Sequence, residues 1–352
     1  MVSFGGTFAG YEHLFGKHYG SDIFRYLLTR AKLNWTALRD RYNRWVVITI
    51  RKEAKKKHLS VYVIIDDMLE EKDKRSRTVV KGGKKKEKVG FSFVTCVLRV
   101  GWFALPLIPQ IALRKEVCVQ RNRHYVSKLD LANKFLDTIH EVGLETRHVI
   151  VLLDSWYTGA KVLNKIHELG YEVIGAVRKD RKVNASSISQ WSSVQNRSAK
   201  TVIRQNSYKY KLSSKTGTLT GLTDAFKVLI SERQKGRSQC ITVRYILCSD
   251  VTMSVQEILR HYQNRWLIET FHQIWQHRFG LKNWQLKGMR RQRNLIIITV
   301  VALGFSVYYF NRTATEAQRS KCEASTVTIF SRALEKTRLE LIQRNSGFTI
   351  PC

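Results

Sequence analysis

Two short apolar runs, each ending in an aspartate, constrain most strongly what this chain can fold into. The first spans residues 59–66 and ends at Asp66, and the second spans residues 148–154 and ends at Asp154. β-Branched runs of this length are typical of buried strands. Because ligands of open α/β sheets usually bind outside the carboxyl ends of the strands, both aspartates are candidate site residues.

The order of the other segments predicts an α/β fold. Ser254 and Glu257 have the spacing of a capping box, so residues 254–278 are predicted to form one long helix. Helices on both faces of a mixed sheet would satisfy the layering that such elements require. Further strands are predicted at 89–100, 102–108, 171–177 and 241–248, and further helices at 22–38, 129–142 and 159–169.

The composition divides the chain into segments. After Arg178 the sequence becomes polar and rich in Ser, Lys, Gln and Asn, with short alternating patches, which indicates an antiparallel β insertion outside the main core. The predicted organisation is a basic helical N-terminal region at 1–58, a core in two parts at 59–178 and 241–310, the β-rich insertion at 179–240 and a C-terminal tail at 311–352.

The apolar stretch 295–310 resembles a membrane span in composition only. Its length of about 16 residues is short of the roughly 20 needed to cross a bilayer, so we expect a buried core helix and no membrane partner. The first ten residues lack the pattern of a secretory signal. The six cysteines are scattered without metal-site spacing, which favours reduced thiols in a cytoplasmic protein.

The charge of the chain indicates a polyanionic partner. The 352 residues include 61 Lys and Arg against 28 Asp and Glu, giving a formal charge of +33. A field of this sign attracts polyanions, of which nucleic acid is the commonest large one. The excess is spread along the chain rather than confined to one tail, which favours nucleic acid over a merely soluble basic surface. A nucleoid-associated protein is therefore expected.

A third acid lies in the stretch Tyr-Gln-Asn-Arg-Trp-Leu-Ile-Glu at 262–269. On a helix, at about 100° per residue, Tyr262, Arg265 and Glu269 would fall within an arc of roughly 60°. Three separated acids on a basic chain suggest metal-dependent phosphodiester chemistry. Two divalent ions can supply the nucleophile and neutralise the developing charge, and magnesium prefers carboxylate oxygens.

These motifs resemble those of DDE-type insertion-sequence transposases, in particular the subgroup with a Y-(2)-R-(3)-E-(6)-K signature. The signature falls on Tyr262, Arg265 and Glu269, and Gln276 stands in the lysine position. The strand before Asp66-Asp67-Met68 is similar to the first acid motif, with Asp66 in the catalytic register. Met68 replaces a small hydroxyl residue there. The second acid motif resembles residues 152–157, and the resemblance covers roughly 59–310.

The resemblance implies an RNase H-like core with a β-rich insertion between the second aspartate and the glutamate. It also implies that Asp66, Asp154 and Glu269 hold two Mg²⁺ ions, for which Mn²⁺ can substitute. The implied activity is cleavage of double-stranded DNA at transposon ends and strand transfer into target DNA, by a dimer in the DNA complex. The implied DNA contacts are Tyr262, Arg265, Gln276, Arg278, Lys287, Arg290 and Arg291.

The residues leave simpler interpretations open. Asp154 could cap the helix that follows it, Arg265 and Glu269 could form an i,i+4 pair, and Tyr262 could be a half-buried helix residue. The basic residues after 281 could be a solvated helix end, and Trp191 could belong to the core of the insertion rather than stack on a base. Two other functions fit: a catalytically decayed, transposase-derived DNA-binding protein, and an RNase H-like nuclease without strand transfer.

Overall fold

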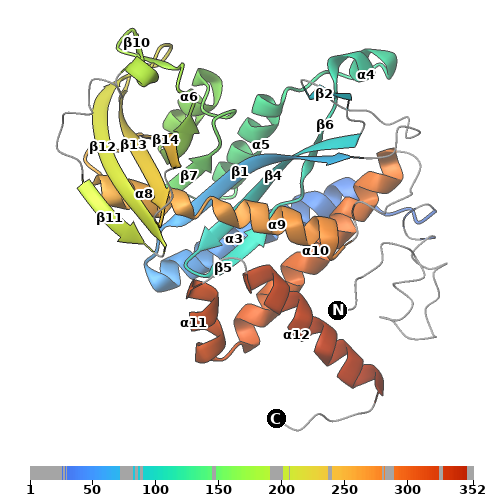
Figure 1. The fold of residues 1–352 in the computed structure, drawn as a ribbon. Helices are drawn as coiled ribbons and strands as arrows, with labels where there is room; N and C mark the ends of the chain where they lie inside the picture. The colour runs from blue at the N-terminus through green and yellow to red at the C-terminus, as the bar shows by residue number, and fades with distance from the viewer. Residues whose placement is uncertain are drawn as a thin grey trace. The chain divides into compact units, whose positions relative to one another are not determined.

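The computed structural model of the chain (Figure 1) divides into two compact units. The helix-rich unit comprises Met1–Leu59, Asp67–Leu144 and Trp266–Cys352, and the strand-rich unit comprises Ser60–Asp66 and Glu145–Arg265. Strand β1 (Val61–Glu71) passes from one unit to the other between Asp66 and Asp67. The structure describes residues 26, 28, 30–71, 82–83, 86–87, 90–144, 148–190, 201–205, 207–236, 240–279, 281, 289–324 and 328–346.

The strand-rich unit is built on a mixed sheet, as predicted. Strand β7 pairs in parallel with β1 on one side and β8 on the other, whereas β8 pairs antiparallel with β14. All five residues of β7 are buried, which fits a parallel strand covered on both faces. Helix α6 contacts β8, and α8 contacts β8, β12 and β14. The bounds are β7 Val149–Leu153, α6 Ala160–Glu168, β8 Glu172–Val177, β9 Lys182–Val183, β10 Ser186–Ser187, β11 Thr201–Gln205, β12 Tyr208–Thr218, β13 Ala225–Lys235, β14 Ile241–Cys248 and α8 Val255–Gln263.

The predicted β-rich insertion continues the sheet instead of standing apart from it. Outward from β14, the sheet continues with β13, β12 and β11, and each strand is antiparallel to its neighbour. Only the last four residues of β14, Tyr245–Cys248, pair with β8, while its whole length pairs with β13. The edge of a strand without a partner exposes unpaired backbone N–H and C=O groups. On one side of β14, β13 pairs with these groups along the whole strand. The boundaries predicted at 179 and 240 stay a prediction, and Trp191 lies outside the described residues.

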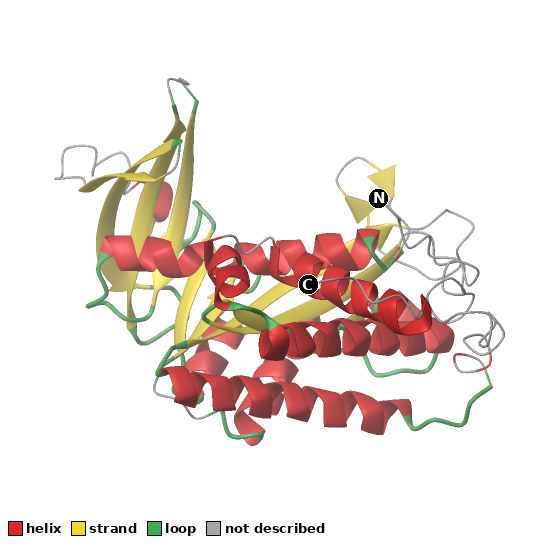
Figure 2. Cartoon of the chain, turned by 90° about the horizontal axis from the view of Figure 1, so that it is seen from below, coloured by secondary structure: helices red, strands yellow, loops and turns green. Residues whose placement is uncertain are grey.

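In the helix-rich unit, strand β4 is the centre of the core. It lies between β1 and β5 and also pairs with β6, so the three-strand order predicted for this part is confirmed. All of β4 is buried, and because side chains alternate along a strand, both of its faces must be covered. Helices α3, α5 and α9 contact it, and Figure 2 shows helices packed along the strands of this unit. The bounds are α3 Trp35–Lys57, β2 Gly82–Gly83, β3 Lys86–Glu87, β4 Gly90–Val100, β5 Phe103–Pro106, β6 Gln110–Ala112, α4 Lys115–Gln120, α5 Lys128–Glu141 and α9 Trp266–His277.

Helix α10 (Met289–Thr313) contains the apolar stretch predicted to be a core helix. Among the described residues it is the one helix long and apolar enough to cross a membrane, and 61% of its apolar window is buried. It contacts α3, β5 and α12, and its Thr299 hydroxyl accepts a hydrogen bond from Trp275 Nε1 at 3.1 Å. It is longer than predicted because the polar residues at both ends are also helical.

Two predictions about the chain's ends are wrong. The predicted helix at 22–38 is interrupted, because residues 31–34 are not helical and α3 begins at Trp35, where the Asn34 side chain accepts from Ala37 N at 3.0 Å. The C-terminal region is helical rather than a polar tail, with α11 (Glu316–Ala324) and α12 (Thr328–Ser346). Helix α12 buries Ile329 and Phe330 and contacts α9 and α10. Its described buried residues are confined to the first turns, so the apolar period was too short to be recognised.

A close approach joins α3, β5 and α10. The buried Tyr42 hydroxyl lies 3.1 Å from Pro106 O and 3.3 Å from Val300 O. A Cβ added at Gly304 would lie 2.0 Å from the Tyr42 oxygen. Burial raises the pKa of Tyr42, so this phenol keeps its proton and its hydrogen bond at any physiological pH. The absence of a side chain at position 304 is therefore required for these elements to pack.

We predict that Gly304→Ala destabilises the protein. Alanine favours a helix over glycine by about 1 kcal/mol, but overpacking a buried contact costs about 1–3 kcal/mol. The measurement is urea unfolding of the wild type and the variant, each also in a Tyr42→Phe background. The penalty should shrink in that background, because the nearest oxygen is gone. A variant that is as stable as the wild type would contradict the contact.

Candidate active site

Asp66 and Asp154 lie side by side in the strand-rich unit. The parallel pairing of β1 with β7 ends at Ile65↔Leu153, and the two aspartates are the next residues on each strand. Asp154 directly follows β7, as predicted. The prediction that Asp66 ends its strand is wrong, because β1 continues to Glu71. Helix α6 has Gly159 as its N-cap, so Asp154 does not cap it.

The signature residues are not on one helix. The predicted helix at 254–278 is two helices, since α8 ends at Gln263 and α9 begins at Trp266. The Asn264 side-chain amide donates to the carbonyls of Arg260 and His261, at 3.3 and 3.1 Å, which occupies acceptors at the end of α8. The single stripe proposed for Tyr262, Arg265 and Glu269 is therefore wrong. The predicted capping box at the start of α8 is confirmed.

The break places Arg265 beside the first aspartate. Arg265 Nη1 donates to Asp66 Oδ2 at 2.7 Å, and the two side chains are 15% and 14% exposed. A charge-assisted hydrogen bond of this length is stronger than a neutral one, and its partial burial reduces screening by water. The turn after α8 thus carries a cation that binds Asp66 on β1.

Tyr262 completes this cluster. Its side chain is buried, and burial is the main cause of its raised pKa. The Asp154 carboxylate acts in the same direction, whereas the cations Arg265 and Arg244 act against it. Arg265 Cζ lies 6.0 Å from the centre of the Tyr262 ring. The phenol is therefore a protonated hydrogen-bond donor, and the charges of Asp154 and Arg265 shift its pKa in opposite directions.

A hydrogen bond that the sequence analysis missed holds α8 on β1. The Tyr62 hydroxyl lies 2.7 Å from His261 Nδ1. Tyr62 and Asp66 share a face of β1 because side chains alternate along a strand, so α8 lies over the face that carries Asp66. Burial lowers the pKa of His261, the nearby Arg260 lowers it further, and Glu257 opposes both. The position of Tyr62, four residues before the acid in a predicted strand, was the available signal.

The neighbouring acid Asp67 has a different partner. Its carboxylate accepts from Lys128 Nζ, at the start of α5, within the helix-rich unit. Adjacent residues of a strand point to opposite faces, so only one of the two acids can lie with Arg265. That residue is Asp66, which agrees with the predicted motif register.

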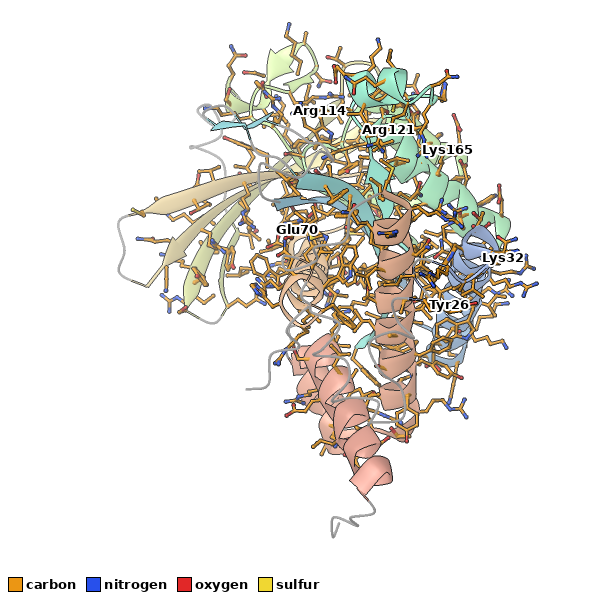
Figure 3. All side chains as sticks on the ribbon, turned by 90° about the vertical axis from the view of Figure 1, so that its right-hand side faces the viewer. Tyr26, Lys32, Glu70, Arg114, Arg121 and Lys165 are labelled. Carbon is orange, nitrogen blue, oxygen red and sulfur yellow. The ribbon has the colours of Figure 1, made fainter. Side chains whose placement is uncertain are left out.

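The remaining signature positions belong to the helix-rich unit. Glu269 lies in the first turn of α9 and is partly exposed. Gln276 Nε2 donates to Glu70 Oε2 at 2.9 Å, and Glu70, labelled in Figure 3, is fully buried on β1. The side chain in the lysine position of the signature therefore supplies a neutral donor to a buried carboxylate. On the same helix, His272 Nε2 lies 2.8 Å from Thr95 Oγ1.

The other basic residues predicted to contact DNA are spread over two elements. Arg278 directly follows α9 and is partly exposed. Arg290 and Arg291 lie in the first turn of α10 and are exposed. Lys287 lies outside the described residues. These positions share a unit with Glu269 and Gln276.

The donor chemistry of the aspartate pair fits a hard divalent cation. Carboxylate oxygens are preferred by Mg²⁺, which is commonly held by one or two carboxylates together with water and substrate phosphate. Within the described ranges, no group of three or more His, Cys, Asp or Glu side chains is gathered closely enough to hold a metal ion. Asp66 and Asp154 are two carboxylates of the kind that such an ion prefers, and they do not form such a group by themselves.

A mixed sheet in which two aspartates follow the last parallel register pair of β1 and β7, next to a tyrosine and an arginine, is an arrangement suited to enzymes that act on phosphodiesters. The family described as transposase DDE domain matches residues 117–305, and DDE superfamily endonuclease matches residues 19–207. Each match spans more than half of the chain, so this chain belongs to the DDE transposase family. DDE superfamily endonucleases generally use divalent metal ions.

The chain is also similar to solved structures of transposases. One is a piggyBac transposase synaptic complex with hairpin DNA, with 12% identity and a TM-score of 0.43, covering 83% of this chain and 57% of that one. Another is a Mos1 transposase paired-end complex with left transposon end, with 16% identity and a TM-score of 0.19, covering 41% of this chain and 43% of that one. The chain thus spans little more than half of the piggyBac chain. None of the curated proteins compared with it matches.

We predict an acid-sensitive stability that depends on His261. A histidine whose pKa is lower in the folded state contributes stability that is present above its ordinary pKa of 6.5 and is lost as the pH falls through the lowered value. Unfolding by urea between pH 5 and 8 should show this loss in the wild type. His261→Gln should flatten the profile below pH 6.5. An unchanged profile would mean that another group is responsible.

We predict that Gln276→Ala destabilises the helix-rich unit by about 1–3 kcal/mol, because it removes a donor from a buried carboxylate. The matched control is Gln273→Ala, on the exposed side of the same helix, which should change stability by less than about 0.5 kcal/mol. Thermal or urea unfolding measures both. Equal effects of the two substitutions would contradict the role of the Glu70 contact.

Proposed function

We propose that this protein is a DNA transposase that cleaves double-stranded DNA at transposon ends and transfers the strand into target DNA. The observation that carries the proposal is the pair Asp66 and Asp154 at the end of the β1–β7 register, with Arg265 bound to Asp66. The family of the chain and its charge of +33 support a DNA substrate. Membership of the Y-R-E-K subgroup with an RNase H-like core is part of the proposal.

Asp66, Asp154 and Glu269 are proposed to hold two Mg²⁺ ions, for which Mn²⁺ can substitute. When bound, such ions activate the attacking water or hydroxyl and neutralise the charge on the leaving oxygen. Glu269 would be the third ligand, supplied by α9. The proposal is supported by the register of β1 and β7, because Asp66 and Asp154 directly follow its last pair, Ile65 and Leu153.

Arg265 and Tyr262 are proposed to position the phosphate. In the structure Arg265 uses one guanidinium nitrogen for Asp66, and the fork of the guanidinium leaves further donors for a phosphate oxygen. Tyr262 keeps its proton, so its hydroxyl can donate but cannot act as a base at neutral pH. The Tyr62–His261 hydrogen bond holds α8, and with it Tyr262, over the face of β1 that carries Asp66.

The partners follow from this proposal. Gln276, Arg278, Lys287, Arg290 and Arg291 would contact DNA away from the reacting phosphate. Gln276 would do so with the second N–H of its side-chain amide or through water, because one N–H donates to Glu70. Two transposon ends would be held by a dimer, in the cytoplasm and in association with the nucleoid.

A catalytically decayed DNA-binding protein is the second candidate. It is favoured by the neutral Gln276 in the lysine position, where the charge of a phosphate-binding side chain is lost. It differs from the first candidate in having no metal-dependent cleavage. A nuclease without strand transfer would cleave but give no joined products.

We predict that Asp66→Asn, Asp154→Asn and Glu269→Gln each reduce Mg²⁺-dependent cleavage and joining of transposon-end DNA by roughly three orders of magnitude or more, because metal ligands contribute several kcal/mol to the transition state. The matched control is Asp67→Asn, which makes the same change one residue further along β1 and should retain cleavage. The assay is a plasmid reaction with and without Mg²⁺. Full activity in the three variants would disprove the proposal, and so would equal loss in the control.

A further inference from the structure

A cavity of about 360 Å³ in the helix-rich unit has an unusual concentration of arginines. It lies among the first turns of α3 and α10, the segment between β5 and β6, and the loop after α4. Arg39, Arg123, Arg290 and Arg293 line it, together with an apolar wall that includes Trp35 and Ile296. Arg123 and Arg39 come from parts of the sequence that carried no DNA-binding prediction.

Among the described residues, only one of the four arginines that line the cavity has a carboxylate partner. Arg39 pairs with Asp40 at 2.8 Å on the exposed surface, and Arg123 Nη1 lies 3.5 Å from the sulfur of Met289. Among the residues that the structure describes, no carboxylate forms an ion pair with Arg123, Arg290 or Arg293. Burial lowers the pKa of Arg293, and the charges of Arg39, Arg290 and Arg123 lower it further.

Two helix N-termini add to this charge. Trp35 opens α3 and Met289 opens α10, and both residues line the cavity. The N-terminus of a long helix carries partial positive charge on its free N–H groups and favours anions. Neither helix has an acidic residue in its first turn. The Asn34 side chain caps one N–H of α3, and the other free N–H groups of both helices add partial positive charge to that of the arginines.

We propose that this cavity binds a backbone phosphate of a DNA strand, at a site separate from the reacting phosphate. The cavity is larger than a phosphate alone, and its apolar wall suits the attached sugar and base. The side chains of Arg123, Arg290 and Arg293 are exposed, so a phosphate can reach them from solvent. The identity of the anion as DNA rests on the proposed function. Arg121, labelled in Figure 3 and 3.9 Å from the Met289 sulfur, lies beside the site.

The test measures binding of a duplex oligonucleotide to the full chain in EDTA, as a function of salt. Arg293→Ala and Arg123→Ala should each weaken binding about tenfold and reduce the salt slope by about 1, because each removes one phosphate contact. The matched control is Arg41→Ala, the same change on an exposed position of α3 that does not line the cavity. It should leave affinity and slope nearly unchanged. Arg293→Lys should retain most of the affinity.

Thermal unfolding of the same variants separates ligand binding from a structural role. Relief of like-charge repulsion should leave Arg293→Ala as stable as the wild type or more so, whereas loss of a structural arginine would lower its Tm. If Arg41→Ala weakens binding as much as the other two, the loss reflects the overall positive charge of the protein rather than this cavity, and the proposal is overturned. It is also overturned if deoxyadenosine monophosphate or inorganic phosphate stabilises the wild type while duplex binding does not depend on Arg293.

The absence of catalysis would not affect this result, because binding is measured without metal. A protein that binds DNA through Arg293 but never cleaves it would refute the proposed function and leave the phosphate site standing. A protein that cleaves DNA, but whose DNA binding does not depend on Arg293 or Arg123, would refute the phosphate site and leave the proposed function unaffected.

Discussion

The ion pair between Arg265 and Asp66 is the contact around which the candidate site is organised. Arg265 belongs to the short turn between Gln263, where α8 ends, and Trp266, where α9 begins. The amide of Asn264 satisfies the last carbonyls of α8, which allows the helix to stop there. The break, not helical periodicity, brings the arginine and the first acid together.

Much of the fold could be predicted from apolar patterning. The runs that became β1 and β7, the helix α5 and the capping box of α8 were recognisable because their signals are local. The interruption at Asn264 was not, since the residues on both sides favour helix and the signal is one side chain. The packing of α12 was missed for a related reason. Its short apolar patch is buried by contacts with α9 and α10, which the sequence around the patch does not reveal.

The candidate site was predictable by residue type but not by geometry. Tyr262, Arg265 and the aspartates were found from motif spacing, whereas Tyr62 and His261 required the knowledge that α8 crosses β1. The cavity with Arg39 and Arg123 shows the same limit. Arg290 and Arg293 are three residues apart on α10, but only tertiary structure brings Arg39 and Arg123 to them. Gln276 was read as a DNA contact, and its hydrogen bond to the buried Glu70 could not be seen in the sequence.

The tandem acids at 66 and 67 have a consequence for how β1 can change during evolution. Sliding β1 by one residue against β7 would exchange its two faces and still present an aspartate next to Asp154. The presence of an aspartate next to Asp154 therefore does not by itself fix the register of β1 against β7. The Tyr62 hydroxyl does, because a valine lies on either side of it and neither can reach His261 with a hydrogen bond. The Tyr62–His261 hydrogen bond, four residues before Asp66, thus favours the register that presents Asp66 rather than Asp67. A shift of β1 by one residue would break this hydrogen bond.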